Sequence, residues 1–425
     1  MKVNKSRIWF LLLIVAIFCI AGCGKENTAK IDQDQTSSRN VFSRTYSAMA
    51  DSSSDGIYVQ TLMPIPDLFY MDRASGKIVF LCGKADCEHG KEGNTDCNAY
   101  FEEDLIRDSI QRVDDKLYVL GQPTKEHNST LYRMDLDGSN REAVTTINAE
   151  AGAGGTRVIG KNMYYIGVPD AGDFSVYHMY RQSIEDKSEL AEDIFPVDEE
   201  EWSARRIEEF YLDEENELIY IAENKYTEDL KYEGSIWKYD IKDETWEEIF
   251  SDTRFFTWFL DGEWFYYSEY TGGADDSGNL IRIEVVTCDP VKRKNLKTGE
   301  EETTTIPGGF LEGYDGNYCY MRTYGEKAGD GLKSIDVYTL DGTMVTSIKS
   351  PVEDYQYNDA VNVGVTYDAI VIHHSPSTSE VYVSENIYLY DKKNITEQKG
   401  DWEKIYINLL YDENSNTLDL HVKQK

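Results

Sequence analysis

One pair of strands recurs along this chain, and that repeat constrains the fold more than any other feature of the sequence. In each unit, a run of consecutive apolar and aromatic residues follows a turn rich in Asp, Gly, Asn or Lys. A second strand, as in IWKYDIKDETWEEI, then carries an aromatic residue beside charged ones. The fifth unit is degenerate, and its best match lies at 293–306. The first strands are predicted at residues 55–60, 114–120, 160–167, 215–222, 261–268, 315–321 and 367–374.

The spacing of these units predicts the architecture. Equivalent points lie about 53 residues apart on average, a length that is typical of a four-stranded propeller blade. We take the equivalent points to be Phe69, Tyr132, Tyr180, Trp237, Arg293, Tyr338 and Tyr388. The sequence therefore predicts an all-β chain in which residues 51–425 form a single β-propeller of seven four-stranded blades. Six or eight blades are the alternatives.

Stacked blades also explain the composition of the strands. In EWFYYS the apolar and aromatic residues are consecutive rather than alternating, as expected where both faces of a sheet are covered. Two packed β-sandwich domains are the competing fold, but sandwich strands have no reason to repeat at a fixed period. The only helical candidate is DEEEWSARRIEEF at 198–210.

One hairpin carries a resemblance to a known family. The segment LYRMDLDGSNREAV resembles the blade signature of the YWTD and TolB-like propellers, in which Tyr-Arg-Met-Asp precedes a Leu-Asp-Gly-Ser-Asn turn. From residue 55 to about residue 400, the chain is similar to a group of uncharacterised propeller lipoproteins of Gram-positive gut anaerobes. The resemblance implies the propeller fold and says little about function.

The N-terminal residues have the pattern of an export signal. Lys2, Lys5 and Arg7 precede the apolar run 8–20, which is shorter than the roughly 20 residues of a membrane-spanning helix. Residues 20–23, Ile-Ala-Gly-Cys, resemble the bacterial lipobox, in which signal peptidase II cuts before a diacylated cysteine. The alternative is an ordinary signal peptide in which Cys23 is incidental.

The first interpretation predicts a signal peptide at 1–22, lipidation at Cys23 and a flexible tether within 23–50. Two acyl chains on Cys23 would hold the protein stably on the outer face of the cytoplasmic membrane of a Gram-positive bacterium. A formal net charge of −35 disfavours nucleic acid and anionic lipid as partners, because both would bring like charge to the surface.

A cysteine-rich stretch, LCGKADCEHGKEGNTDCNAY, follows the predicted strand KIVFL. It places Cys82, Cys87, His89 and Cys97 within sixteen residues. Thiolates and imidazole are the usual ligands of a closed tetrahedral zinc site, although this spacing is not that of a standard zinc finger. Almost no apolar residue lies between Cys82 and Cys97, so packing alone does not order the loop.

A disulfide is the competing interpretation, since exported proteins commonly carry them. A bridge from Cys82 to Cys97 would contribute roughly 3 kcal/mol, whereas zinc sites in isolated peptides are worth on the order of 10 kcal/mol. Five cysteines remain beyond Cys23, and an odd number does not pair completely. Cys288 and Cys319 lie in strand-like sequence and are expected to be buried thiols. We favour one structural zinc ion bound by three cysteines and a histidine.

Other candidate sites are weaker. The stretch DLDGSN, with Asp135, Asp137 and Asn140, resembles the start of a calcium loop but lacks the distal Glu, and a hairpin around Gly138 explains it better. Five aromatic residues of FFTWFLDGEWFYYSEYTGG could form a sugar-stacking platform, but most are expected in the core, with Tyr270 the best exposed candidate. These five are Trp258, Trp264, Tyr266, Tyr267 and Tyr270.

The histidines give no catalytic pattern. His373 and His374 are adjacent on a predicted strand and point to opposite faces, while His127, His178 and His421 are isolated in the sequence. No nucleophile elbow, P-loop or dinucleotide-binding pattern is present. The sequence therefore favours a non-catalytic surface lipoprotein that binds an extracellular protein, glycan or envelope partner. The alternative is an extracellular carbohydrate-active or other hydrolytic enzyme that uses the propeller channel.

Overall fold

The structure is a computed structural model, and the chain divides into Met1–Arg39 and a compact unit, Asn40–Lys425. Signal peptide 1–22, Cys23 and the predicted tether up to residue 41 lie outside the described residues. In the part of the chain that the structure describes, no helix is long and apolar enough to cross a membrane. The described residues are 42–43, 50–52, 55–60, 67–72, 74–75, 77–91, 93–102, 104–105, 109–122, 129–147, 156–167, 177–186, 190–195, 204–213, 216–226, 232–271, 287–325, 331–352, 355, 359–366, 369–376, 383–397, 400–412 and 417–424.

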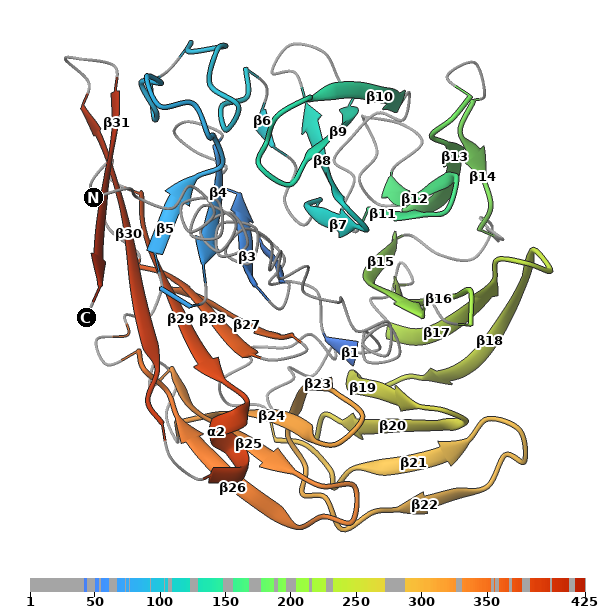
Figure 1. Cartoon of the computed structure of the whole chain (residues 1–425). Coiled ribbons are helices and arrows are strands. Elements are labelled where there is room, and N and C mark those ends of the chain that lie inside the picture. The colour runs from blue at the N-terminus through green and yellow to red at the C-terminus, as the bar shows by residue number, and fades with distance from the viewer. Residues whose placement is uncertain are drawn as a thin grey trace, which may run out of the picture. The chain divides into compact units, whose positions relative to one another are not determined.

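Seven antiparallel sheets surround a common centre in the unit Asn40–Lys425 (Figure 1), so the predicted seven-bladed propeller is confirmed. Blade 1 consists of β2 (Ala50–Ser52), β3 (Gly56–Gln60), β4 (Leu68–Asp72) and β5 (Lys77–Phe80). Blade 2 consists of β7 (Gln111–Val113), β8 (Lys116–Gln122), β9 (Ser129–Asp135) and β10 (Glu142–Ile147), with β6 (Asp104–Leu105) also paired to β8. Blade 3 consists of β11 (Arg157–Ile159), β12 (Asn162–Gly167), β13 (His178–Ser183) and β14 (Glu192–Asp193).

The other four blades complete the ring. Blade 4 consists of β15 (Ala204–Asp213), β16 (Leu218–Tyr226), β17 (Tyr232–Asp240) and β18 (Thr245–Asp252). Blade 5 consists of β19 (Phe256–Asp261), β20 (Trp264–Glu269), β21 (Lys292–Asn295) and β22 (Glu301–Thr303). Blade 6 consists of β23 (Phe310–Tyr314), β24 (Cys319–Tyr324), β25 (Leu332–Tyr338) and β26 (Met344–Lys349), with β1 (Phe42–Ser43) paired to β23. Blade 7 consists of β27 (Ala360–Val365), β28 (Ala369–Ser375), β29 (Val383–Asp391), β30 (Glu403–Asp412) and β31 (Thr417–Gln424).

The repeat predicted from the sequence has a direct structural meaning. Each predicted first strand is the second strand of a blade, and each of the seven equivalent points lies in the third strand. The degenerate fifth unit forms β21 and β22, in which Arg293 pairs with Tyr266 of β20 and Glu302 of β22. The repeat therefore identified every blade, including the one with the weakest signature.

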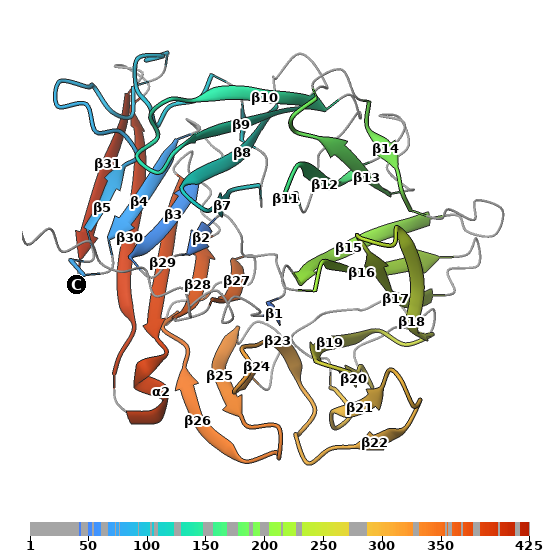
Figure 2. The ribbon, with the colours of Figure 1, turned by 45° about the vertical axis from the view of Figure 1, so that its right-hand side comes forward.

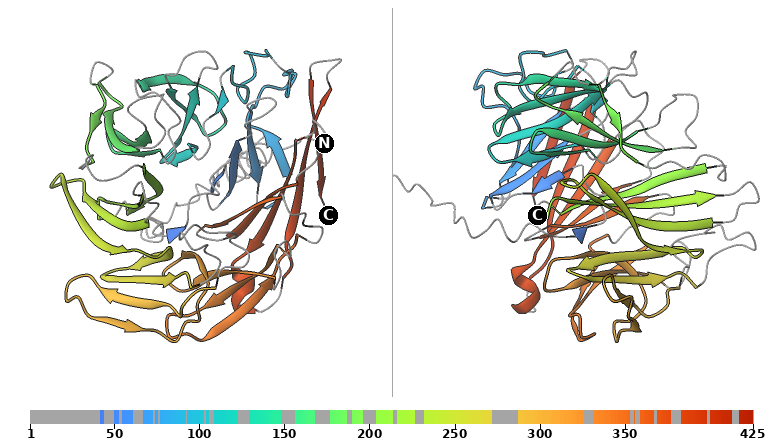
Figure 3. Two further views of the ribbon diagram at one scale, coloured as in Figure 1. Left: turned by 180° about the vertical axis from the view of Figure 1, so that it is seen from behind. Right: turned by 90° about the vertical axis from the view of Figure 1, so that its right-hand side faces the viewer.

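Two local expectations are wrong. The helical candidate at 198–210 is strand from Ala204 onward, where β15 pairs with β16 along its length. Blade 7 has five strands instead of four, and the short helix α2 (Lys393–Glu397) lies between β29 and β30. Figure 3 shows this larger sheet between blade 6 and blade 1.

Apolar packing joins the blades into a continuous ring. Separate clusters of buried side chains connect blades 2 and 3, blades 3 and 4, blades 4 to 6, and blades 6 and 7. A fifth cluster connects blade 1 to both neighbours, because it combines Ile57 and Phe69 with Leu117 of blade 2 and Val371 of blade 7. Each sheet is thus covered on both faces, as the consecutive apolar residues of its strands require.

The strand order gives the ring two different faces. The first and second strands of each blade are joined by only two to four residues, and the third-to-fourth turns lie on that same side. We call this side the hairpin face. Gly160 and Gly262 serve two of its turns, with φ of 57° at each. The second-to-third and blade-to-blade connections lie on the opposite side, the loop face, and include the longest connections of the unit, β5 to β7 and β20 to β21.

Candidate metal centre

The predicted metal ligands lie in the connection from blade 1 to blade 2, directly after the outer strand β5. This connection leaves β5 in an ordered way, since the N–H of Leu81 donates to the carbonyl oxygen of Leu68 at 2.8 Å. The N–H of Cys82 then donates to the carbonyl of Phe80 at 2.7 Å, which turns the chain at the first ligand. Cys82 is therefore positioned by the end of a sheet strand.

Short turns position the other three ligands. The N–H of Cys87 donates to the carbonyl of Lys84 at 3.3 Å, and the N–H of His89 donates to the carbonyl of Cys87 at 3.1 Å. The N–H of Cys97 donates to the carbonyl of Asn94 at 2.9 Å. Lys84 Nζ donates a hydrogen bond across the loop to the carbonyl oxygen of Asp96. These turns bring residues that are far apart in the loop back beside Cys82.

The four ligand atoms converge as the sequence predicts. One ligand atom each from Cys82, Cys87, His89 and Cys97 lies within 4.8 Å of the other three. The distance from Cys97 Sγ to His89 Nδ1 is 3.5 Å, close to the separation of about 3.6 Å that tetrahedral zinc imposes on a sulfur and a nitrogen ligand. This group could therefore hold a metal ion with little movement of its side chains.

Neighbouring residues orient the ligands. The N–H of Asn98 points at Cys82 Sγ over 3.4 Å, and Asn94 Nδ2 lies 3.7 Å from Cys87 Sγ. The His89 ring stacks on Phe80, with ring centroids 5.2 Å apart. Donors of this kind are the usual outer partners of thiolate ligands, because they stabilise the negative charge on sulfur.

The three thiols differ in acidity. Burial raises the pKa of Cys97 to about 12, and burial also raises the pKa of Cys87. Burial acts in the same direction on Cys82, but backbone N–H groups of Lys84 and Asn98 donate to its sulfur, and its pKa is lowered overall. Cys82 is therefore the thiol of this group that ionises most readily, and the thiolate is the form that binds metals.

The disulfide alternative finds no support in the geometry. Cys82, Cys87 and Cys97 are all thiols, as is Cys319. Cys319 is fully buried in β24, as expected, whereas Cys288 is only half-buried and forms an isolated bridge with Tyr270 instead of lying in a strand. Cys97 is 1% exposed and belongs to the apolar cluster of blades 1, 2 and 7, so the site is fixed to the propeller core at one ligand.

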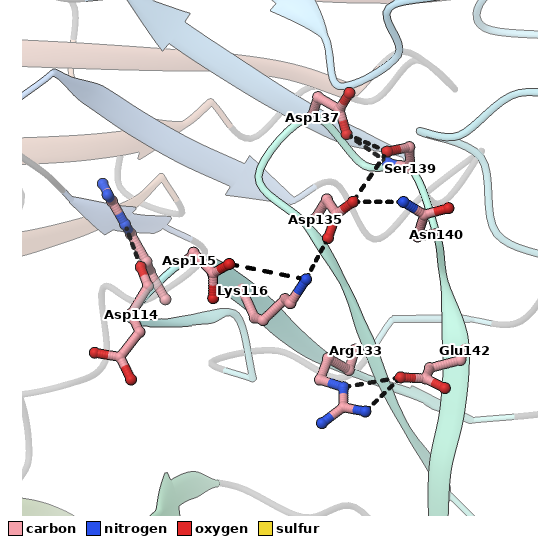
Figure 4. A network of polar contacts seen from close by, with 10 residues as sticks. Asp114, Asp115, Lys116, Arg133, Asp135, Asp137, Ser139, Asn140 and Glu142 are labelled. Carbon is pink, nitrogen blue, oxygen red and sulfur yellow. Dashed lines mark hydrogen bonds and ion pairs between the residues drawn. The ribbon is translucent and has the colours of Figure 1, made fainter. Parts of the chain in front are cut away.

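The stretch DLDGSN is a hairpin rather than a calcium loop. Asp135 accepts from Lys116 Nζ at 2.5 Å and from Asn140 Nδ2 at 2.6 Å, while Asp137 accepts from the hydroxyl and N–H of Ser139 (Figure 4). Hydrogen bonds from Lys116 and Asn140 lower the pKa of Asp135. These carboxylates are thus committed to the β9–β10 turn, in which Gly138 has φ of 78°.

The aromatic stretch belongs mostly to the core. Trp258, Tyr266 and Tyr267 are at most 2% exposed, and Trp264 packs against the same cluster. Tyr270 is half-buried, with the Phe310 ring 5.1 Å away on one side and the Phe255 ring 6.3 Å away on another. The Arg293 guanidinium lies 4.4 Å from the centroid of the Trp264 ring. A sugar-stacking platform on these five residues is therefore not supported, because neighbouring side chains cover them.

Two histidines belong to polar clusters that sequence reasoning missed. His178 is not isolated: its Nδ1 contacts the Asp193 carboxylate across β13 and β14. His374 Nε2 contacts Asp359 Oδ2 at 2.8 Å, and both residues are buried. Only the strand pairing brings these residues together, so spacing along the sequence gives no signal for them. His127 lies outside the described residues, and His421 lies in β31.

Buried carboxylates form a second set of clusters that the sequence did not indicate. Glu223 is fully buried between Arg205 and the indole N–H of Trp237, which donates at 2.7 Å. Glu269 of blade 5 contacts Arg254 and Lys292, and Glu312 of blade 6 contacts Arg322. Each of these carboxylates lies in a different blade and has a cation as its partner.

No protein-family model matches the chain, and no curated protein matches it. Its structural neighbours are β-propeller proteins. One is the β-propeller domain of the trilobed protease from Pyrococcus furiosus, with 13% identity, 75% of this chain and 95% of that chain covered, and a TM-score of 0.46. Another is the acylaminoacyl peptidase of Pyrococcus horikoshii, with 14% identity, 76% and 52% covered, and a TM-score of 0.46.

An uncharacterised protein from Listeria monocytogenes is similar at 11% identity, with 73% of this chain and 94% of that chain covered and a TM-score of 0.42. This chain spans about half the length of the acylaminoacyl peptidases that it matches, 52% in each case. At such identities the likeness concerns the fold alone, and no residue role follows from it. The narrower resemblance to propeller lipoproteins stays a prediction.

Proposed function

We propose that this protein is a lipid-anchored surface protein whose propeller binds an extracellular protein, glycan or envelope component without chemical turnover. One observation carries the proposal: the two longest connections of the unit, β5 to β7 and β20 to β21, belong to the loop face, whereas the first-to-second turns of the hairpin face have only two to four residues. Loops held by a rigid scaffold are the usual place for recognition. The lipobox-like residues 20–23 support the location on the outer face of the cytoplasmic membrane.

The buried carboxylates favour binding over hydrolysis. A glycosidase needs two carboxyl groups that face each other across a bond, one of them with a raised pKa. Glu223, Glu269 and Glu312 instead lie in separate blades, each beside an Arg. Each of these three carboxylates is thus engaged in an ion pair with an arginine side chain.

Binding and turnover are separated by one assay. Residues 24–425, purified as a soluble chain, are offered to a glycan array and to extracts of cell-envelope proteins, and the same glycans are checked for cleavage products. Retention of a defined glycan or protein without any product supports the binding function. Hydrolysis of a glycan polymer would instead establish the alternative, an extracellular carbohydrate-active enzyme that uses the propeller channel.

We further propose that Cys82, Cys87, His89 and Cys97 hold one structural Zn²⁺. Four protein ligands fill a tetrahedral site and leave no position for a substrate, so the ion would order the loop rather than perform chemistry. Metal analysis of chain purified without oxygen should give about one zinc per chain. In that sample, Cys82, Cys87 and Cys97 should react with alkylating reagents only after a chelator is added.

Two other outcomes contradict the zinc proposal. Absence of metal together with two fewer reactive thiols in the denatured chain would establish a disulfide between two of these cysteines. Absence of metal with all five thiols of the propeller reactive after denaturation would leave the loop with neither kind of cross-link. It would then be tested directly as a binding loop.

A further inference from the structure

The N-terminal end of the compact unit does not begin at blade 1. Strand β1 pairs with β23, the first strand of blade 6, and it also contacts β19 of blade 5 and β27 of blade 7. All three partners are the first strands of their blades. Figure 2 shows β1 inside the ring, close to β23 and β19. The chain therefore passes through the centre of the ring before it forms β2 of blade 1.

The register of β1 gives its direction. Phe42 pairs with Tyr314 and Ser43 pairs with Gly313, in antiparallel fashion. Tyr314 is the last residue of β23 and precedes the turn at residues 315–318, which belongs to the hairpin face. Phe42 thus lies at the hairpin-face end of β23, and the next residue along the chain lies one step toward the loop face. Strand β1 therefore runs from the hairpin face toward the loop face.

From this geometry, we infer that β1 is built into the propeller as an added central strand. We further infer that attachment through this strand directs the loop face toward extracellular partners. The orientation rests on the proposed lipid anchor at Cys23. Eighteen residues separate Cys23 from Phe42, and a random coil of that length has a mean end-to-end distance of about 25 Å. The hairpin face is therefore held toward the membrane, and the loop face is directed away from it.

The added strand also bears on the alternative function. A strand at the innermost edges of blades 5, 6 and 7 occupies part of the space in which a channel enzyme would bind its substrate. It also gives the exposed edge of β23 a partner, which is a common way of protecting a strand edge. Recognition by the loops then needs no open route through the ring.

The added strand is tested by hydrogen exchange on the mature chain, residues 23–425. Proline has no N–H and does not support a strand pair, so Phe42→Pro with Ser43→Pro should release β1. The control carries Ser37→Pro with Ser38→Pro, in the predicted tether. We expect at least one of the amides of Gly313 and Tyr314, the two residues that pair with β1, to exchange at least tenfold faster in the first variant than in the control, while those of β16 are unchanged.

Rates within twofold of the control at both residue 313 and residue 314 would overturn the added strand. A second variant, Phe42→Gly with Ser43→Gly, keeps the backbone N–H groups and weakens the strand only by chain entropy. Its exchange rate at these residues should lie between those of the control and the proline variant. An intermediate rate would show that the effect of proline does not come from misfolding of the whole chain. Because this measurement needs no membrane, it decides the added strand whether or not the chain is lipidated.

The orientation is tested with the lipidated chain in phosphatidylcholine vesicles that carry a headgroup quencher. A maleimide fluorophore is placed by Asn317→Cys on the hairpin face or by Thr253→Cys on the loop face, both exposed positions. The parent chain, labelled in the same way, gives the background from the native thiols. We expect at least twofold stronger quenching at residue 317 than at residue 253.

The outcomes separate this inference from the proposed function. The Cys23→Ser variant should not sediment with the vesicles. If the wild-type chain also fails to sediment, the proposed lipid anchor is wrong, and the exchange result alone decides whether β1 is an added strand. Sedimentation with equal quenching at the two positions, or with stronger quenching at residue 253, would overturn the orientation while the anchor remains.

Discussion

Gly138, at the tip of a blade 2 hairpin, lies against the carbonyl oxygen of Leu81, the residue that precedes the first cysteine of the candidate metal centre. A Cβ atom on Gly138 would collide with that oxygen and would lie 3.3 Å from Cβ of Asn98. The DLDGSN hairpin therefore contacts the residues that flank both ends of the Cys82–Cys97 loop. This contact explains why the loop is ordered although it has few apolar residues of its own.

Substitution Gly138→Ala should loosen this contact. The residue has φ of 78°, which costs a non-glycine residue roughly 1–2 kcal/mol, and the collision with Leu81 adds to that cost. Gly262→Ala is the matched control, because Gly262 has φ of 57° and nothing within 4 Å of the added carbon. The cost of positive φ is common to both variants, so the collision should make the loss in denaturant unfolding at least about 1 kcal/mol larger for Gly138→Ala than for Gly262→Ala. Equal losses would mean that the loop does not rest on the hairpin.

The Cys97→Ser substitution should abolish the metal site. Cys97 is the most deeply buried of the four ligands, so its loss removes both a ligand and the connection to the core. We expect the zinc content to fall below half of the wild-type value and the thermal midpoint to fall by several degrees. Cys288→Ser, a change at a half-buried cysteine outside the group, should leave the zinc content unchanged. A full complement of zinc in Cys97→Ser would show that the ion binds elsewhere.

Neutralising Glu223 should destabilise blade 4 strongly. In Glu223→Gln, the buried Arg205 keeps its charge without a carboxylate partner, and breaking buried pairs of this kind costs about 3–5 kcal/mol. Glu185→Gln breaks the pair with Lys161, in which both side chains are more than 60% exposed, and should change the free energy of unfolding by less than about 1 kcal/mol. Similar values for the two variants, measured by urea unfolding, would contradict the importance assigned to the buried pair.

Asp67 should make stability depend on pH. Burial raises its pKa from 3.8 to about 7. Between these values the folded chain keeps a proton that the unfolded chain has lost, so this group makes the free energy of unfolding fall as the pH rises, by up to about 4 kcal/mol in total. Above pH 7 its contribution is constant. Asp67→Asn should flatten the curve between pH 4.5 and 7, and a wild-type slope in that variant would exclude Asp67 as the cause.

The repeat made the blades predictable because each blade must bury both faces, and this requirement leaves consecutive apolar residues in the second strand. The error at 198–210 has a physical cause. Arg205 is buried in β15 and Arg206 is exposed, so the strand alternates in burial although both residues are basic. Glu223 of β16 neutralises the charge of Arg205. This ion pair cannot be recognised from the sequence until the pairing of β15 with β16 is known.

The convergence of the four candidate metal ligands was predictable because these residues are close in sequence and their chemistry is restricted to few roles. The contact of His178 with Asp193 was not, since these residues meet through the pairing of β13 with β14. Strand β1 was also beyond prediction from the sequence. Phe42 and Ser43 form a two-residue strand with no apolar run around them, and only the inner edge of β23 gives them a partner.

Blade 1 comes entirely from Ala50–Phe80 and blade 7 from Ala360–Gln424, and their described strands belong to separate sheets. Side chains alone close the ring there, where Ala369 and Leu389 join the cluster that contains Ile57. A ribosome completes blade 1 long before blade 7, and at 5–20 residues per second the interval is on the order of tens of seconds. During that time the nascent chain exposes an apolar sheet face that has no partner yet, so this face must be protected from aggregation until the last blade emerges.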